Sequence, residues 1–197
     1  MATEASTGTL LTIDEARAPG TESTWDIDPK HSLVEFAVRH MMFTTVRGRF
    51  NEIHGTIHCA DEADVSRAAV EATINAASID TGDADRDAHL RSAEFLDVDR
   101  YPTITFKSKR VERVAEDQLS VIGDLTIRGV SREAELATTY NGRGKNPWGQ
   151  EVAGFTAITK INRKDFGLTW NVALESGGFL VGDTLDVLVE VQAIKQN

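Results

Sequence analysis

The stretch SLVEFAVRH, residues 32–40, alternates between apolar side chains and polar or small ones. One parity holds Val34, Phe36, Val38 and His40. A period of two places successive side chains on opposite faces of a β-strand. This stretch therefore predicts a strand with one buried face.

The same period recurs along most of the chain. It is clearest in TITFKSKRV (103–111), LSVIGDLTI (119–127) and TLDVLVEVQAI (184–194), with further candidate strands at about 45–59, 67–79, 131–141 and 151–162. About eight strands with short connections predict an all-β fold, built on one antiparallel sheet that is either closed as a barrel or stacked as a sandwich. The apolar parity changes between Phe50 and Ile53, which predicts a bulge, with Gly55 allowing a tight bend.

Two segments lack the alternation and predict one or two short helices. DADRDAHLRSAEFL, residues 83–96, begins with aspartates that suit a helix N-terminus. NRKDFGLTW, residues 162–170, predicts a single helical turn that ends at Gly167.

Small residues at the inward positions favour a barrel that contains a cavity, because bulkier side chains would fill a solid core. These small residues are Ala37, Ala68, Ala72, Ala76, Gly123, Gly154 and Ala157. The predicted lining of an elongated apolar cavity is Val34, Phe36, Val38, Ala72, Ile74, Phe106, Val121, Phe155 and Val189.

Composition narrows the class of protein. The chain has 197 residues, a formal net charge of −10 and one cysteine, Cys59. The acidic balance argues against nucleic acid as a partner, since phosphate binding needs a basic surface. A single cysteine excludes an intrachain disulfide. No stretch reaches the roughly 18 consecutive apolar residues of a membrane-spanning helix, so we expect a protein that does not span a membrane.

The start of the sequence predicts a separate extension. Residues 1–23 are polar, small and weakly patterned, and they lack the basic and apolar regions of a signal peptide. We expect a flexible N-terminal extension over residues 1–23, a single domain over residues 24–197, and a cytoplasmic protein.

The sequence gives little evidence for a catalytic or metal-binding site. Asp87 and His89 are two residues apart, which on a helix places them on different sides. No G-x-S-x-G pattern marks a nucleophilic serine. In a strand, His54 and His58 would lie roughly 13 Å apart, too far to share one ion. We therefore expect no catalytic residues and no metal site.

A basic group gathers on one predicted hairpin. Arg39, His40, Arg47 and Arg49 lie within eleven positions in an otherwise acidic chain, and could receive an anionic headgroup at a barrel mouth. The alternative is a solvated hairpin rim.

Several blocks, in order, resemble the YceI-like family. They are WDIDPKHSLVEFAVRHMMFTTVRGRF followed by HGTI, then SIDTGDADRDAHLRSAEFLDVDRYPTITF, LSVIGDLTIRGVSREAEL, INRKDFGL and VGDTLDVLVEVQA. The resemblance covers about residues 24–194.

The resemblance implies a lipocalin-like, eight-stranded antiparallel β-barrel with a long apolar tunnel. It implies binding of a polyisoprenoid or similar amphiphilic lipid for storage, transport or protection, without catalysis or a cofactor, and it implies a homodimer. Arg86, Asp87, His89 and Leu90 carry the motif of the charged segment, which the resemblance makes a structural closure of the tunnel. Two other functions stay open: an enzyme acting on a small apolar substrate in the barrel, and a structural or stress-related protein with a filled core.

Overall fold

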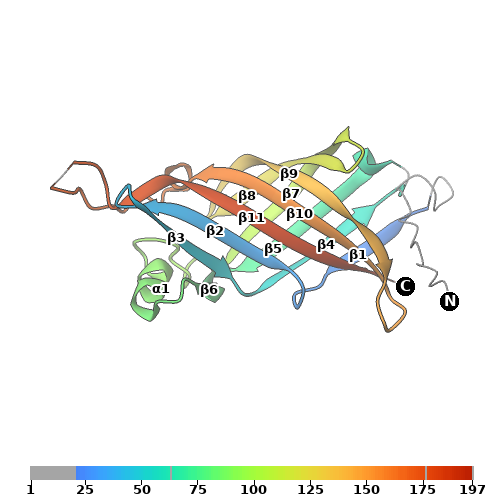
Figure 1. The fold of residues 1–197 in the computed structure, drawn as a ribbon, viewed down its shortest axis with the longest axis horizontal. Helices are drawn as coiled ribbons and strands as arrows, with labels where there is room; N and C mark the ends of the chain where they lie inside the picture. Colours follow the sequence, from blue (N-terminus) through green and yellow to red (C-terminus); the bar gives the residue numbers. More distant parts are fainter. Residues whose placement is uncertain (1–20, 63, 176, 197) are drawn as a thin grey trace, which may run out of the picture.

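The computed structural model describes residues 21–62, 64–175 and 177–196 (Figure 1). The strands are β1 (Ser23–Ile27), β2 (Leu33–His40), β3 (Thr44–Phe50), β4 (Ile53–Cys59), β5 (Ala68–Asn75), β6 (Ile79–Asp80), β7 (Thr103–Ala115), β8 (Gln118–Ile127), β9 (Val130–Lys145), β10 (Glu151–Asn162) and β11 (Val181–Lys195). The helices are α1 (Ala84–Arg91) and three 3-10 turns, η1 (Val65–Arg67), η2 (Ala76–Ser78) and η3 (Arg163–Phe166).

The strands close into an antiparallel barrel. Neighbours follow the order β1-β4-β5-β7-β8-β9-β10-β11, and β11 returns to pair with β1, with Trp25 opposite Lys195. The first half of β11 pairs instead with β2, which pairs with β3. β1 and β2 thus form two halves of one long strand, as do β3 and β4. The predicted eight-stranded antiparallel barrel with a short helix is confirmed.

The break between β3 and β4 falls at Asn51 and Glu52, where the change of parity predicted an irregularity. Gly55 lies beyond it, within the regular part of β4, and has a different role from the predicted bend. A Cβ atom at Gly55 would lie 2.3 Å from the Glu71 carbonyl oxygen. Close approach of β4 to β5 therefore requires glycine here.

Both helical segments begin and end with local capping. The Asp83 side chain accepts a hydrogen bond from the Arg86 backbone N–H at 3.0 Å, which caps α1. The predicted turn after β10 is η3, and it ends at Gly167, whose φ of 74° favours glycine.

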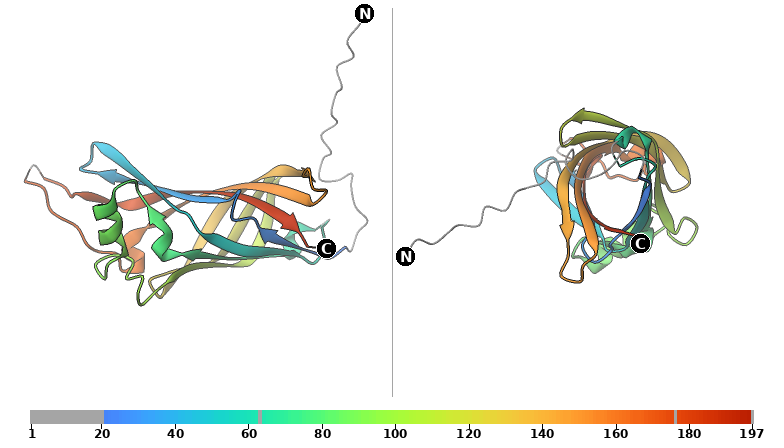
Figure 2. Two further views of the ribbon diagram at one scale, coloured as in Figure 1. Left: turned by 90° about the horizontal axis from the view of Figure 1, so that it is seen from below. Right: turned by 90° about the vertical axis from the view of Figure 1, so that its right-hand side faces the viewer.

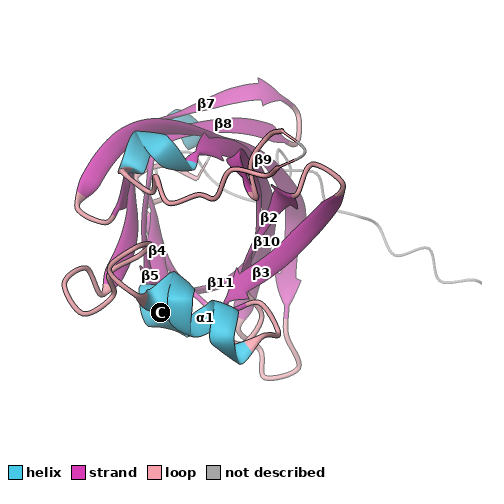
Figure 3. Ribbon diagram, turned by 90° about the vertical axis from the view of Figure 1, so that its left-hand side faces the viewer, coloured by secondary structure: helices cyan, strands magenta, loops and turns pink. Residues whose placement is uncertain are grey.

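The barrel has two distinct ends. The helix end carries α1, η3, the β2–β3 turn and residues 171–175 and 177–180 (left in Figure 1). The far end carries the start of β1, the end of β11 and the β7–β8 and β9–β10 hairpins. Views along the barrel axis show the strands as a ring, with α1 beside one end (Figures 2 and 3).

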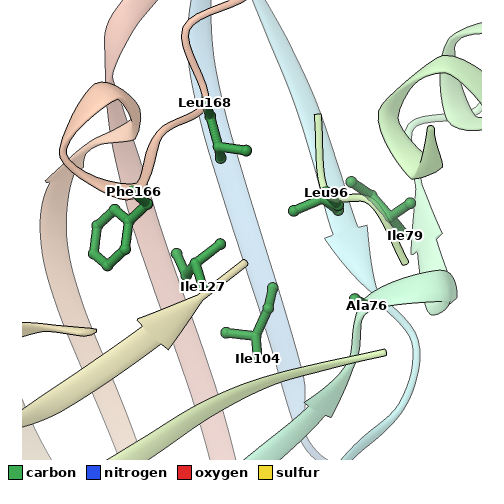
Figure 4. Close-up of a cluster of buried hydrophobic side chains, with 7 residues drawn as sticks. All are labelled: Ala76, Ile79, Leu96, Ile104, Ile127, Phe166 and Leu168. Atoms are coloured by element: carbon green, nitrogen blue, oxygen red, sulfur yellow. The ribbon is translucent and has the colours of Figure 1, made fainter. Parts of the chain in front are cut away.

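The buried side chains form clusters along the barrel interior. The cluster at the helix end consists of Ala76, Ile79, Leu96, Ile104, Ile127, Phe166 and Leu168 (Figure 4). A second cluster at the far end contains Trp25, Ala153 and Ala193. The predicted extension over residues 1–23 lies almost wholly outside the described residues, and β1 begins at Ser23.

Candidate functional site

The barrel encloses an apolar cavity of about 410 Å³. It is lined along the whole barrel, from Leu90 and Leu168 at the helix end to Cys59 and Glu62 at the far end. The volume falls within the usual range for small-molecule sites, about 300–1,000 Å³. The interior can therefore hold an apolar molecule.

Strand alternation produces the lining. On β5, Ala72 and Ile74 line the cavity, whereas Glu71 and Thr73 are exposed on the other face. All nine residues of the predicted lining do line the cavity: Val34, Phe36, Val38, Ala72, Ile74, Phe106, Val121, Phe155 and Val189. Their contact with a ligand stays a prediction.

Two of the small residues assigned to the inward face lie on the outside. Phe36 and Phe155 line the cavity, so their neighbours Ala37 and Gly154 occupy the opposite face of β2 and β10. Ala37 contributes to a groove on the outer surface. The expectation that these two residues face inward was wrong because it placed both parities of a strand on one face.

Helix α1 is fixed to the barrel through Thr81. The buried Asp87 carboxylate accepts hydrogen bonds from the Thr81 backbone N–H at 2.9 Å and from its hydroxyl at 2.6 Å. Arg86 donates to the Thr81 hydroxyl oxygen at 2.7 Å and to its carbonyl oxygen at 3.0 Å. Arg86 and Asp87 thus meet through a shared partner.

The remaining motif residues face the end of the barrel. Leu90 lines the cavity. The His89 imidazole lies 2.6 Å from the Glu94 carboxylate and packs edge-on against Phe95 and Trp170, with ring centroids 5.0 and 4.8 Å away. This arrangement orients His89 toward a surface carboxylate and two aromatic rings.

Arg163 is a buried charge at the helix end that the sequence analysis missed. Its guanidinium donates to the carbonyl oxygens of Leu168, Trp170 and Gly182, and to the Asp183 carboxylate at 3.2 Å. Burial lowers the pKa of this guanidinium, and Asp183 opposes the shift. Arg163 fixes the return of the chain from η3 to β11. Its acceptors are mostly carbonyl groups, which have no signature in the sequence.

The far end of the cavity is polar, and this feature was also missed. The Glu62 carboxylate lies 2.6 Å from the Lys195 ammonium and 3.2 Å from the Arg143 guanidinium. The Lys195 ammonium lies 5.3 Å from the centre of the Trp25 ring. Glu62 and Arg143 line the cavity. These charges come from the segment after β4, from β9 and from β11, so no local pattern could reveal them.

Two neutral groups add to the polar lining at this end. Burial raises the pKa of the Cys59 thiol, and the negative charge of Glu62 raises it further. Burial also raises the pKa of the Tyr140 phenol. Both groups can offer hydrogen bonds to a polar group at the end of an otherwise apolar ligand.

The predicted headgroup residues do not line the cavity. Arg39, Arg47 and Arg49 are exposed on the outer face of β2 and β3, and His40 is half-buried at the end of β2. Arg49 lies 3.3 Å from the Asp80 carboxylate. A role for these residues in binding a headgroup stays a prediction, without support from the cavity geometry.

The two histidines near Cys59 lie four positions apart on the same strand, β4. His54 is exposed, and the His58 Nδ1 atom lies 3.3 Å from the Thr24 hydroxyl oxygen. Within residues 21–62, 64–175 and 177–196, no three His, Cys, Asp or Glu side chains are grouped to hold a metal ion.

Comparison with known proteins gives a consistent assignment. Residues 25–193 match the model of the YceI-like domain. Protein YceI of Salmonella newport is 36% identical over 186 residues, covering 94% of this chain and 93% of that protein. The crystal structure of the Campylobacter jejuni YCEI protein is 30% identical, with a TM-score of 0.68 over 81% of this chain and 90% of that one.

A further solved structure shares the fold at low identity. It is a polyisoprenoid binding domain from Saccharophagus degradans, 16% identical, with a TM-score of 0.67 over 87% of this chain and 98% of that one. In the described part of the chain, no helix has the length and apolar character needed to cross a bilayer.

Proposed function

The chain belongs to the YceI-like domain family, and on that premise we propose that its barrel binds a single polyisoprenoid or similar long amphiphilic lipid. The observation that carries the proposal is the apolar cavity lined from one end of the barrel to the other. The Saccharophagus degradans structure, described as a polyisoprenoid binding domain, has the same fold and supports this class of ligand.

Hydrophobic burial supplies the affinity. Each methylene group transferred from water into an apolar cavity contributes about 0.8 kcal/mol. A long apolar chain therefore binds tightly with few polar contacts. Storage, transport and protection of the lipid all follow from shielding the chain from water.

The two ends of the cavity give the ligand a direction. The helix end is lined by Leu90, Phe95, Leu96 and Leu168, and the Arg163 guanidinium there is already engaged with backbone carbonyl oxygens. The far end offers Tyr140 and the charged groups of Glu62 and Arg143. An amphiphile is most stable with its tail toward the helix end and its polar head toward the far end, because a buried polar group needs a hydrogen-bond partner.

The polar side chains of the α1 motif that could act as catalysts are already engaged with other groups of the protein, which favours ligand binding over catalysis. Asp87 and Arg86 are engaged with Thr81, and His89 lies against Glu94. An enzyme acting on a small apolar substrate is the second candidate, favoured by the half-buried Cys59 and Tyr140 in the cavity wall. The homodimer and the cytoplasmic location stay predictions.

Native mass spectrometry of the purified protein tests the proposal. We expect a retained adduct whose mass matches a lipid recovered by organic solvent extraction. With added polyprenyl alcohols of increasing length, affinity should rise with each isoprene unit until the cavity is filled. An enzyme would instead release a chemically altered lipid. Absence of an adduct, together with affinities that do not depend on chain length, would contradict lipid binding.

A further inference from the structure

Large apolar side chains gather on two turns at the helix end. Eight such side chains are exposed among the described residues. Five of them form what we call the apolar tip: Met41, Met42, Phe43, Val172 and Phe179. Met42 is 64% exposed and Phe43 is 77% exposed. A cluster of this kind marks an interaction site, whereas scattered single residues do not.

The two turns are held together. The Met41 backbone N–H donates to the Leu180 carbonyl oxygen at 2.8 Å, and a side chain at Gly178 would come within 3.6 Å of the Met42 Cγ atom. Figure 1 shows residues 171–175 and 177–180 projecting past the end of the barrel, on the same side as the β2–β3 turn. The apolar tip is therefore one continuous surface, and it lies at the outermost part of the molecule at the helix end.

The backbone of the β2–β3 turn does not favour methionine. The Phe43 N–H donates to the His40 carbonyl oxygen at 3.2 Å, with Met41 at φ 50° and Met42 at φ 65° between them. Two consecutive positive φ values define a type I′ turn, which favours asparagine and glycine. Neither the turn conformation nor burial accounts for two methionines here.

We propose that the apolar tip inserts into the surface of a lipid bilayer. Bilayer insertion removes from water the side chains that the folded protein leaves exposed, and flexible methionine suits an irregular lipid surface. The proposal goes beyond lipid binding in the cavity, since the tip could dock whether or not the cavity is filled.

The charges beside the tip suit anionic headgroups. Residues 39–50 contain three arginines and no acidic residue, in a chain whose net charge is −10. Arg39 and Arg47 are exposed, and no ion pair to either occurs in the part of the chain that the structure describes. Lys164 lies 5.8 Å from the centre of the Phe179 ring. The Lys164 ammonium is paired with the Asp183 carboxylate at 2.8 Å, and the segment 171–180 carries one carboxylate, Glu175.

The tip is continuous with the cavity wall. Val38 and Val181 line the cavity, and they lie three residues before Met41 and two after Phe179. A bilayer that receives the tip is therefore positioned at the helix end of the cavity. This placement would let a lipid pass between membrane and barrel with little exposure to water.

Co-sedimentation with vesicles tests the proposal. The wild-type protein should bind phosphatidylcholine vesicles, and several-fold better when phosphatidylglycerol is included, with salt removing the difference. Met41→Asn with Met42→Gly should lower the partition coefficient at least tenfold. The same double variant should raise the melting temperature, because both residues suit a type I′ turn. This combination separates loss of docking from loss of folding.

Matched variants complete the experiment. Val114→Ser with Trp148→Ser removes two exposed apolar side chains from the far end, where they are 69% and 79% exposed, and should leave vesicle binding unchanged. Arg39→Gln with Arg47→Gln should remove the preference for phosphatidylglycerol and keep binding to phosphatidylcholine. Failure of the wild-type protein to bind either vesicle would overturn the proposal. So would equal losses in the tip and far-end variants, or dissociation of an oligomer by the tip variant, which would make the tip an interface between copies.

Discussion

Thr81 donates two hydrogen bonds to Asp87, one from its backbone N–H at 2.9 Å and one from its hydroxyl at 2.6 Å. Both donors lie just before α1, and the accepting carboxylate belongs to the helix itself. The contact therefore ties the helix to the strand that precedes it, β6. Asp87 is 7% exposed, so loss of its carboxylate would leave donors without partners in a dry environment.

Asp87→Ala should destabilise the fold by about 1–3 kcal/mol, the cost of leaving buried hydrogen-bonding groups unsatisfied. Asp85→Ala is the matched control, because Asp85 is exposed in the first turn of the same helix. Denaturant unfolding measures both. Equal stabilities for Asp87→Ala and the wild type would show that the contact is not important to the fold.

Arg163→Lys should destabilise the fold, although the substitution keeps the positive charge. A lysine cannot reproduce a planar fork that reaches the carbonyl oxygens of Leu168, Trp170 and Gly182 together. We expect a loss of about 1.5–3 kcal/mol, the range for hydrogen bonds to charged groups. Hydrogen exchange should show the loosening within residues 168–182.

Lys164→Met provides the comparison for Arg163. Lys164 pairs with the same carboxylate, Asp183, at 2.8 Å, but both partners are more than one-third exposed. An exposed pair contributes about 0–1 kcal/mol. A larger effect from Lys164→Met than from Arg163→Lys would contradict the assigned roles.

Ala72→Trp should block the cavity while preserving the barrel. Ala72 lines the cavity from the middle of β5, where an indole would occupy space that the ligand needs. Ala69→Trp places the same side chain on the outer face of the same strand. Native mass spectrometry should show the lipid adduct in Ala69→Trp and at least a tenfold reduction in Ala72→Trp. Equal lipid content in the two variants would mean that the ligand lies elsewhere.

Asp28 should make the stability of the barrel depend on pH in the acid range. A hydrogen bond from His31 is the main cause that lowers the pKa of this carboxyl below its ordinary value of 3.8, and the Lys30 N–H and Gln192 add to the effect. The unfolded chain therefore takes up a proton at a higher pH than the folded one. The stabilisation is complete above the ordinary value and is lost as pH falls through the lowered one.

Unfolding of Asp28→Asn across a pH series measures this contribution. The variant should be less stable than the wild type near neutral pH, and the difference should shrink below pH 3.8. A difference that stays constant to the lowest pH would show that the contribution of Asp28 does not come from its charge.

Strand periodicity was enough to predict an antiparallel sheet and the cavity lining, whereas the choice of a barrel over a sandwich came from the small inward residues and from the family resemblance. Successive side chains of a strand point to opposite faces, and the polar side chains of these strands face water. Ile74 and Val189, which have the other parity, therefore face the cavity. The errors arose where this rule was relaxed, at Ala37 and Gly154. The end of η3 at Gly167 was predictable because the chain there needs a left-handed residue.

The polar parts of the site were not predictable in the same way. Glu62 and Lys195 lie 133 positions apart in sequence and meet only when the barrel closes. Arg163 looks like an ordinary surface cation, because its acceptors are backbone carbonyl groups. The arginines of the β2–β3 hairpin were identified as a group, but only strand register shows that three of them face away from the cavity.

The pairing of β11 with both β1 and β2 makes closure of the barrel depend on contacts between distant parts of the chain. Residues 181–195 supply the partner for strands that begin about 150 positions earlier, so the barrel closes only when segments this far apart in sequence have met. Pairings between such distant segments form slowly and leave strand edges exposed in the meantime. Until β11 has paired with β1 and β2, the apolar side chains that line the cavity are therefore open to solvent.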